Sequence, residues 1–236
     1  MRQTKQAATG QLGWGVLTVL AVLVLPSGAS ATEVGVAAPI DAAATAARVQ
    51  ARYDETRTMS GRFVQEVALG ASGRVLRSEG TMHFRKPGRM RWEYATPEPQ
   101  TLIANGETLW IYQPEENQVL RAKLAGAFDS QTPVSFLFGV ARLERDFRPE
   151  LLAPAADGSL RLKLVPKNAA ENSAHALVLE VDPESWDLRA AIVRDVLGNQ
   201  TRVELLDVQR NLPLADALFE FKRPPGTDLI EAPGGG

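Results

Sequence analysis

The 236-residue chain contains no cysteine, and this absence excludes disulfide bonds, thiol catalysis and cysteine-ligated metal sites. A fold of this composition must therefore be stabilised by packing alone. The chain also has no large excess of charge of either sign, because it contains 26 basic and 28 acidic residues and its formal net charge is −2. This balance argues against nucleic acid or an anionic membrane surface as the main partner.

Histidine is nearly absent as well, since the chain has only His83 and His175. They lie far apart in the sequence, and no carboxylate partner for either can be identified. The chain also lacks the G-x-S-x-G, P-loop and H-E-x-x-H motifs. Acidic residues are scattered on the polar faces of predicted strands, where solvated surface is the ordinary interpretation. We therefore predict no catalytic residue, no metal site, no cofactor and no enzymatic activity.

The long apolar run of the chain is Trp14–Leu25, which follows a short basic start. It ends at a proline, and Ala29–Ala31 then supplies the small-x-small pattern that signal peptidase needs. The run is shorter than the roughly 20 residues of a membrane span, so a cleaved secretory signal peptide over residues 1–31 is favoured over a membrane anchor. No cysteine follows the run, so the chain is not predicted to be a lipoprotein itself.

The mature chain, residues 32–236, is long enough for one domain with a sizeable core. Residues 32–40 and 232–236 are small, polar or glycine-rich, and we expect them to be flexible ends. The sequence shows no repeat of fixed length and no long linker. One β-rich domain is therefore the economical interpretation.

An amphipathic helix is predicted over Asp41–Thr58, which is rich in alanine and free of glycine and proline. Asp41 is a plausible N-cap. Four residues fall at helical spacing and form a thin apolar stripe: Ala42, Ala46, Val49 and Tyr53. The pattern fits a helix packed on a core and a movable cover equally well.

From Gly61 the hydrophobic period changes to two, which predicts antiparallel strands joined by short turns. The strongest hairpin signal is Asn105-Gly106, and Pro114–Asn117 supplies a second turn. Strands resume after the Asp157-Gly158 turn, with one more short strand before the proline-rich C-terminal exit. The pattern predicts a mainly β fold with a few helices.

A second, short helix is predicted within Asp129–Gly139, where Pro133 suits the first helical position. The predicted helix is apolar on nearly all sides, because four large side chains project from it: Val134, Phe136, Leu137 and Phe138. A helix of this kind must be covered on most sides.

Strand alternation predicts one strongly apolar face around residues 82–94. Met82, Phe84 and Lys86 share that face, while Thr81, His83 and Arg85 share the other. In the next strand the apolar side is formed by three residues: Met90, Trp92 and Tyr94. Two interpretations remain open, an ordinary sheet core past which Lys86 extends to water, and the lining of a cavity for an apolar ligand.

Several segments, in this order and after a signal peptide, resemble the periplasmic outer-membrane lipoprotein carrier family of the LolA type. The segments are RFVQ at 62–65, SEGTM at 78–82, RKPGRMRW at 85–92, PQTLIANGETLWIY at 99–112, DSQTPVSFLF at 129–138 and FEFKRPPG at 219–226. The resemblance runs from about residue 41 to 231. It implies an incomplete, open antiparallel β-barrel with a helical lid and an apolar interior.

The resemblance further implies a monomeric periplasmic protein of a Gram-negative bacterium. Such a protein accepts lipoproteins released by an inner-membrane ABC transporter, shields their acyl chains and delivers them to an outer-membrane acceptor lipoprotein. An alternative is a related half-barrel envelope protein that senses lipoproteins or carries another amphiphile, such as a glycolipid. A sensor usually needs a second domain, for which this chain is too short.

Ten residues are predicted to form the cavity lining or the lid: Phe63, Met82, Phe84, Met90, Trp92, Leu102, Ile111, Phe136, Leu137 and Phe138. The family usually has an arginine before the proline that matches Pro87, and this arginine bonds to the backbone of the lid. Here Lys86 takes that position, which keeps the charge but loses the planar fork of donors. We therefore predict Lys86 as the lid latch, with Arg85 as the second candidate.

Overall fold

The fold is seen in a computed structural model, which describes four stretches of the chain: residues 41–124, 142–167, 176–195 and 197–232. The predicted signal peptide and the whole of the second predicted helix, with Phe136, Leu137 and Phe138, lie outside these stretches, as does His175.

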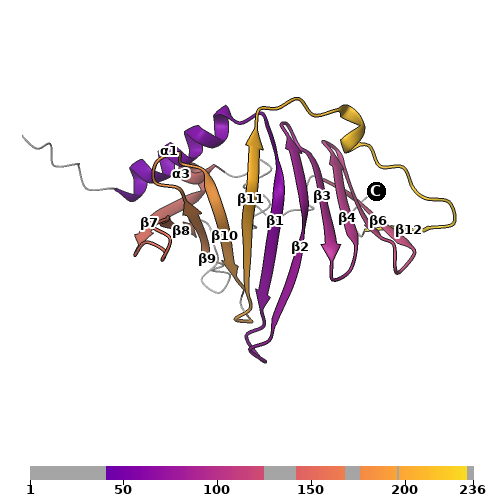
Figure 1. Cartoon of the computed structure of the whole chain (residues 1–236), viewed down its shortest axis with the longest axis horizontal. Helices are drawn as coiled ribbons and strands as arrows, with labels where there is room; N and C mark the ends of the chain where they lie inside the picture. Colours follow the sequence, from indigo (N-terminus) through magenta and orange to yellow (C-terminus); the bar gives the residue numbers. More distant parts are fainter. Residues whose placement is uncertain (1–40, 125–141, 168–175, 196, 233–236) are drawn as a thin grey trace, which may run out of the picture. The chain divides into compact units, whose positions relative to one another are not determined.

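The described strands form one sheet of twelve, in the order β12-β6-β5-β4-β3-β2-β1-β11-β10-β9-β8-β7 (Figure 1). The strand bounds are β1 Thr58–Ala68, β2 Val75–Arg85, β3 Arg89–Thr96, β4 Gln100–Asn105, β5 Thr108–Gln113, β6 Gln118–Lys123, β7 Phe147–Leu152, β8 Leu160–Pro166, β9 Ala176–Val181, β10 Leu188–Arg194, β11 Gln200–Arg210 and β12 Asp228–Glu231. Neighbouring strands are antiparallel except β12, which pairs with β6 in parallel. Since β12 and β7 end the order, the sheet is unclosed, and the predicted open antiparallel architecture is confirmed.

The predicted turn chemistry is present where β4 meets β5. The Asn105 side-chain oxygen accepts hydrogen bonds from the backbone N–H groups of Glu107 (3.0 Å) and Thr108 (2.9 Å). Gly106 has φ +107°, a conformation that glycine adopts without steric cost. Between β5 and β6, the Asn117 N–H donates to the Pro114 carbonyl at 3.1 Å. Both predicted hairpins are confirmed.

Strand β7 was not predicted, because Pro149 interrupts its pattern and proline disfavours a strand. The structure resolves the conflict by placing β7 at the edge of the sheet, where a missing N–H donor costs no ladder bond. The last short strand is predicted before the proline-rich exit, at the start of LFEFKRPPGTDLIEAP, and this placement is wrong. A 3-10 turn, η1 (Asp216–Phe219), lies there instead, and a short strand, β12, follows the prolines.

Helix α1 (Ala42–Glu55) begins as predicted, because the Asp41 carboxylate accepts the Ala44 N–H at 3.2 Å. It ends three residues before the predicted end, since Thr56 is already extended. Ala46 and Val49 are fully buried against a group that we call the helix-side cluster. Its members are Ala46, Val49, Leu143, Phe147, Leu162, Leu164, Leu177, Leu179, Val181 and Ala191. The stripe of α1 therefore packs on β7–β10, together with the short helix α3 (Leu143–Asp146).

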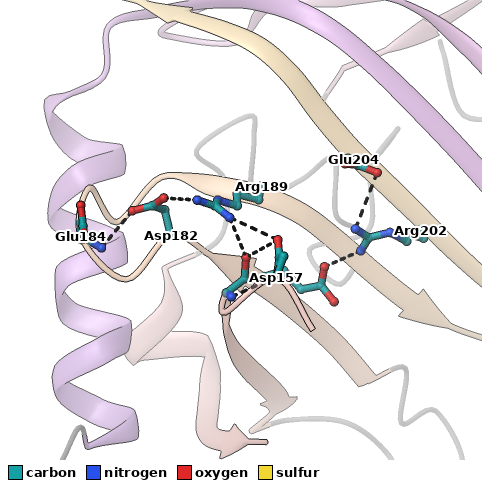
Figure 2. Close-up of polar contacts among 8 residues, drawn as sticks. Asp157, Asp182, Glu184, Arg189, Arg202 and Glu204 are labelled. Atoms are coloured by element: carbon teal, nitrogen blue, oxygen red, sulfur yellow. Dashed lines mark hydrogen bonds and ion pairs between the residues drawn. The ribbon is translucent and has the colours of Figure 1, made fainter. Parts of the chain in front are cut away.

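The connection from β9 to β10 is held by Asp182, whose carboxylate accepts the N–H groups of Ser185 (2.8 Å) and Glu184 (2.9 Å). Arg189 joins Asp182 to Asp157, with 3.2 Å between the Arg189 and Asp157 atoms (Figure 2). The two backbone donors, with Arg189 adding to them, lower the pKa of Asp182 to about 2.

This depressed pKa predicts an acid dependence of stability. The stabilisation by the Asp182 carboxylate is fully present above its unfolded-state pKa of 3.8 and is lost as the pH falls toward about 2. Asp182→Asn keeps an oxygen acceptor but does not titrate. We expect this variant to be less stable than the parent at pH 6, with a gap that narrows toward pH 2 in urea unfolding. The exposed Glu115→Gln should follow the parent, and a constant gap for Asp182→Asn would contradict the assignment.

Candidate functional site

The predicted apolar face forms a second cluster, which we call the sheet cluster. Its buried members are Met59, Phe63, Met82, Phe84, Met90, Trp92, Ala104, Leu109, Val203 and Leu205. Met82 pairs with Trp92, and Trp92 with Leu102 on β4. Leu102 in turn pairs with Ile111, and both pack against the cluster. The structure thus brings together all seven predicted lining residues that it describes.

Aromatic contacts form the centre of the sheet cluster. The ring centroids of Phe63 and Trp92 lie 4.1 Å apart, and the Phe63 ring meets Tyr94 edge-on at 5.0 Å. Phe84 contacts Trp92 at 5.9 Å, also edge-on. The Tyr94 hydroxyl donates to the Gln65 side-chain oxygen at 3.0 Å, and burial raises the pKa of Tyr94. The cluster is therefore apolar through its centre, with a neutral phenol at one end.

Gly80 leaves the space that the Phe63 ring occupies. A Cβ at this position would lie 1.8 Å from the Glu93 carbonyl oxygen and 2.9 Å from the Phe63 ring. The β2–β3 pairing also shifts register between Glu79 and Gly80. The glycine of the SEGTM segment is thus required by close packing of β3 and Phe63 on β2.

Five cluster members were not predicted as lining: Met59, Ala104, Leu109, Val203 and Leu205. A signal existed for two of them, because Val203 and Leu205 alternate in the predicted strand TRVELLDVQ. That strand pairs with β1, so its apolar side joins Phe63. The pairing of distant strands was needed to assign the face.

Lys86 follows β2 and reaches the last turn of α1. Its ammonium group donates a hydrogen bond to the Tyr53 carbonyl oxygen and lies 3.5 Å from the centroid of the Tyr53 ring. Burial lowers the pKa of Lys86, while the nearby Asp54 carboxylate raises it and Arg142 lowers it. A cation that loses hydration in this way gains from a carbonyl dipole and an aromatic face. The predicted geometry, an ammonium group at a helix end, is present.

The same end of α1 has a second attachment, formed by the start of α3. Arg142 forms an ion pair with Asp54 at 2.8 Å, and the Leu143 N–H donates to the Gln50 side-chain oxygen at 3.0 Å. These polar contacts and the Lys86 bond all meet the last two turns of α1. The end of the helix is therefore attached at the surface by hydrogen bonds and ion pairs.

Arg85, the second latch candidate, points to the opposite face, and its assignment to the latch is corrected. Its guanidinium donates to the Leu214 carbonyl at 2.9 Å, forms an ion pair with Asp216 and lies 4.9 Å from the centroid of the Phe219 ring. Strand alternation explains the difference, since adjacent residues face opposite sides. Arg85 therefore fixes the C-terminal segment, residues 211–227, and not α1.

Little free space remains where α1 meets the sheet cluster. A cavity of about 40 Å³ is lined by residues of both sides, among them Val49, Tyr53, Met59, Leu188 and Val208. This volume holds no more than a few water molecules. An acyl chain could enter here only if α1 moved away from the sheet.

The model of the family described as outer membrane lipoprotein carrier protein LolA matches residues 54–222. The chain belongs to this family.

Two relatives from the LolA family are each named outer-membrane lipoprotein carrier protein. The protein from Cupriavidus necator is 36% identical and covers 82% of this chain and 90% of its own length. The protein from Alkalilimnicola ehrlichii is 35% identical, with 82% and 86% covered. A crystal structure of an uncharacterized conserved protein from Thermus thermophilus shares the fold, with a TM-score of 0.52, 14% identity and 81% and 99% of the two chains covered. Among the described residues of this LolA-family chain, no helix has the length and apolar character needed to cross a membrane.

Close packing at Gly80 predicts that Gly80→Ala destabilises the protein by on the order of 3 kcal/mol, because β3 must move away from β2. Chemical denaturation with tryptophan fluorescence measures the change. Gly73→Ala is the control, since a Cβ there meets no atom within 4 Å and its cost comes only from φ +67°. A Gly80→Ala variant no less stable than Gly73→Ala would show that the strands do not approach so closely.

Proposed function

We propose that this protein is a periplasmic lipoprotein chaperone that shields acyl chains against the sheet cluster. The observation that carries the proposal is a buried face of aromatic and methionine side chains beside a helix whose end is attached by polar bonds. Methionine and aromatic side chains adapt their packing to chains of different shape. Family membership supports the same function.

The lining of the acyl-chain site would comprise Phe63, Met82, Phe84, Met90, Trp92, Leu102 and Ile111. Phe136, Leu137 and Phe138 would belong to the lid that cargo displaces. In this proposal residues 32–236 form one half-barrel domain, which is exported by the signal peptide at 1–31 and works as a monomer. It binds no nucleotide or nucleic acid and catalyses no reaction.

Binding energy sets a requirement on such a carrier. Each acyl methylene removed from water contributes about 0.8 kcal/mol, so several chains would bind nearly irreversibly in a preformed pocket. Opening the lid must offset part of this gain. The closed, cargo-free state then competes with cargo, and the Lys86 bond to Tyr53 adds to its stability.

The partners follow from the route of the cargo. An inner-membrane ABC transporter would supply lipoproteins with exposed acyl chains, and an outer-membrane acceptor lipoprotein would receive them. Transfer requires each successive protein to bind the acyl chains more favourably than the one before.

Release from spheroplasts tests the function. The protein is expressed from the full chain, purified in its exported form and added to spheroplasts of a Gram-negative bacterium. We expect lipoproteins to appear in the supernatant as one-to-one complexes, because their acyl chains are covered. Buffer without the protein and a heat-unfolded sample serve as controls. Absence of release, with a glycolipid or other amphiphile found bound by mass spectrometry, would favour the alternative carrier function.

The latch is tested by exchanging the donor at residue 86. In Lys86→Leu we expect the closed state to lose about 1 kcal/mol, the value of a partly exposed charged hydrogen bond, so that cargo is retained roughly fivefold more tightly. Lys86→Arg should restore the bond and release cargo at least as readily as the parent. Amide hydrogen exchange of α1 in the cargo-free protein measures the closed state directly.

Arg57→Leu is the matched control, since Arg57 is an exposed cation just after α1 and, among the described residues, its side chain forms no hydrogen bond or ion pair with that helix. Equal cargo release by the parent and Lys86→Leu, with unchanged exchange of α1, would refute the latch.

A further inference from the structure

Three large apolar side chains are exposed together at one end of the sheet. Leu197 is 76% exposed, Val75 59% and Leu76 46%. Leu197 lies in the turn between β10 and β11, while Val75 and Leu76 begin β2 after its turn with β1. We call the described residues of these two turns, 69–76, 195 and 197–199, the paired tips.

The paired tips are joined to each other by a backbone-to-side-chain hydrogen bond and by close approach of their backbones. The Gly70 N–H donates to the Asn199 side-chain oxygen at 3.0 Å, and a Cβ on Gly70 would lie 2.7 Å from the Gly198 carbonyl carbon. The Asp195 carboxylate also accepts the N–H groups of Leu197 and Asn199, each at 2.9 Å. Leu197 is thus presented on a turn that is fixed against its neighbour.

Strand register places the paired tips far from the latch. Ala68, the last residue of β1, pairs with Val75 and with Gln200. The first residue of β1, Thr58, pairs with Arg85, beside Lys86. Figure 1 shows the two turns side by side at the end of β1, β2, β10 and β11 opposite to α1. Binding at the tips therefore leaves the α1 end of the sheet accessible.

Three arginines lie close in sequence to the exposed apolar side chains. Arg74 precedes Val75 and is exposed. Arg194 precedes the second turn and donates to the Gln200 side-chain oxygen at 3.1 Å. Arg77 is exposed and pairs with Glu66 at 3.0 Å. Residues 66–77 and 194–200 thus carry three arginines against the carboxylates of Glu66 and Asp195, in a chain whose net charge is −2. The tips are thus locally basic on a protein that is acidic as a whole.

We propose that the paired tips dock on an anionic phospholipid surface, with Leu197 entering the interface and the exposed Arg74 facing the headgroup phosphates. The tips are two adjacent turns with little area, whereas a stable protein interface needs about 800 Å² from each partner. A lipid interface needs only a few apolar side chains with cations around them. The net negative charge of the chain keeps the contact weak and reversible, and the inference does not depend on the carrier function.

Vesicle flotation of the exported protein without cargo tests the proposal. Vesicles of phosphatidylcholine alone are compared with vesicles that also contain phosphatidylglycerol, at low salt. We expect flotation only with phosphatidylglycerol, and a loss of about tenfold in Leu197→Ser, since one leucine side chain withdrawn from the interface is worth about that factor. Arg74→Gln should weaken flotation and reduce its dependence on salt.

Leu212→Ser is the matched control, because Leu212 is 47% exposed at the α1 end of the sheet. It should float like the parent, and all variants should keep the parent's thermal unfolding. The proposal is overturned if the parent fails to float with either vesicle, or if Leu197→Ser floats as well as Leu212→Ser. Equal flotation with both vesicle types would overturn the role of Arg74.

Discussion

An open sheet of twelve strands cannot protect its apolar side chains from water by backbone hydrogen bonds, and the rest of the structure depends on how the face that carries Met82 and Trp92 is covered. Toward β7 the cover is helix α1, which buries Ala46 and Val49 in the helix-side cluster. Toward β2 and β3 the apolar residues form the sheet cluster. Leu188 packs against both clusters, so they adjoin on the same face. Helix α1 is thus packed on the helix-side cluster along its length, and only its C-terminal end reaches the neighbouring sheet cluster.

Adjacent cations at the end of β2 hold different elements because a strand alternates its sides. Lys86 reaches the Tyr53 carbonyl on the side of the sheet cluster, while Arg85 holds Leu214 and Asp216 on the other. The C-terminal segment is further fixed by Phe221, which stacks on Trp110 at 6.0 Å. One short stretch thus links the sheet to the helix on one side and to the C-terminal segment on the other. Because Arg85 and Lys86 are adjacent in the backbone, a shift of Pro87 or its neighbours would alter the contacts with α1 and those with the C-terminal segment together.

Local chemistry was sufficient to predict the features that depend on a few neighbouring residues. The Asp41 cap, the Asn105-Gly106 turn and the alternation through Met82 and Trp92 are all of this kind. The features that were missed depend on distant partners. Strand β7 was missed because Pro149 is compatible with a strand only at a sheet edge, and the edge position is set by the whole strand order. The need for glycine at position 80 arises only because β3 and Phe63 pack closely against it. The donor Lys86 could be predicted with its side of the sheet, but its acceptor required the position of α1.

The acceptor of the Lys86 hydrogen bond is a backbone carbonyl, so this bond, unlike the contact with the Tyr53 ring, does not depend on the identity of residue 53. Every amino acid carries the same carbonyl, so drift in the helix sequence leaves the oxygen in place as long as the last turn stays wound. What the ammonium group senses is therefore the winding of the helix end. A partner that unwound this one turn would break the Lys86 bond without touching the ammonium group.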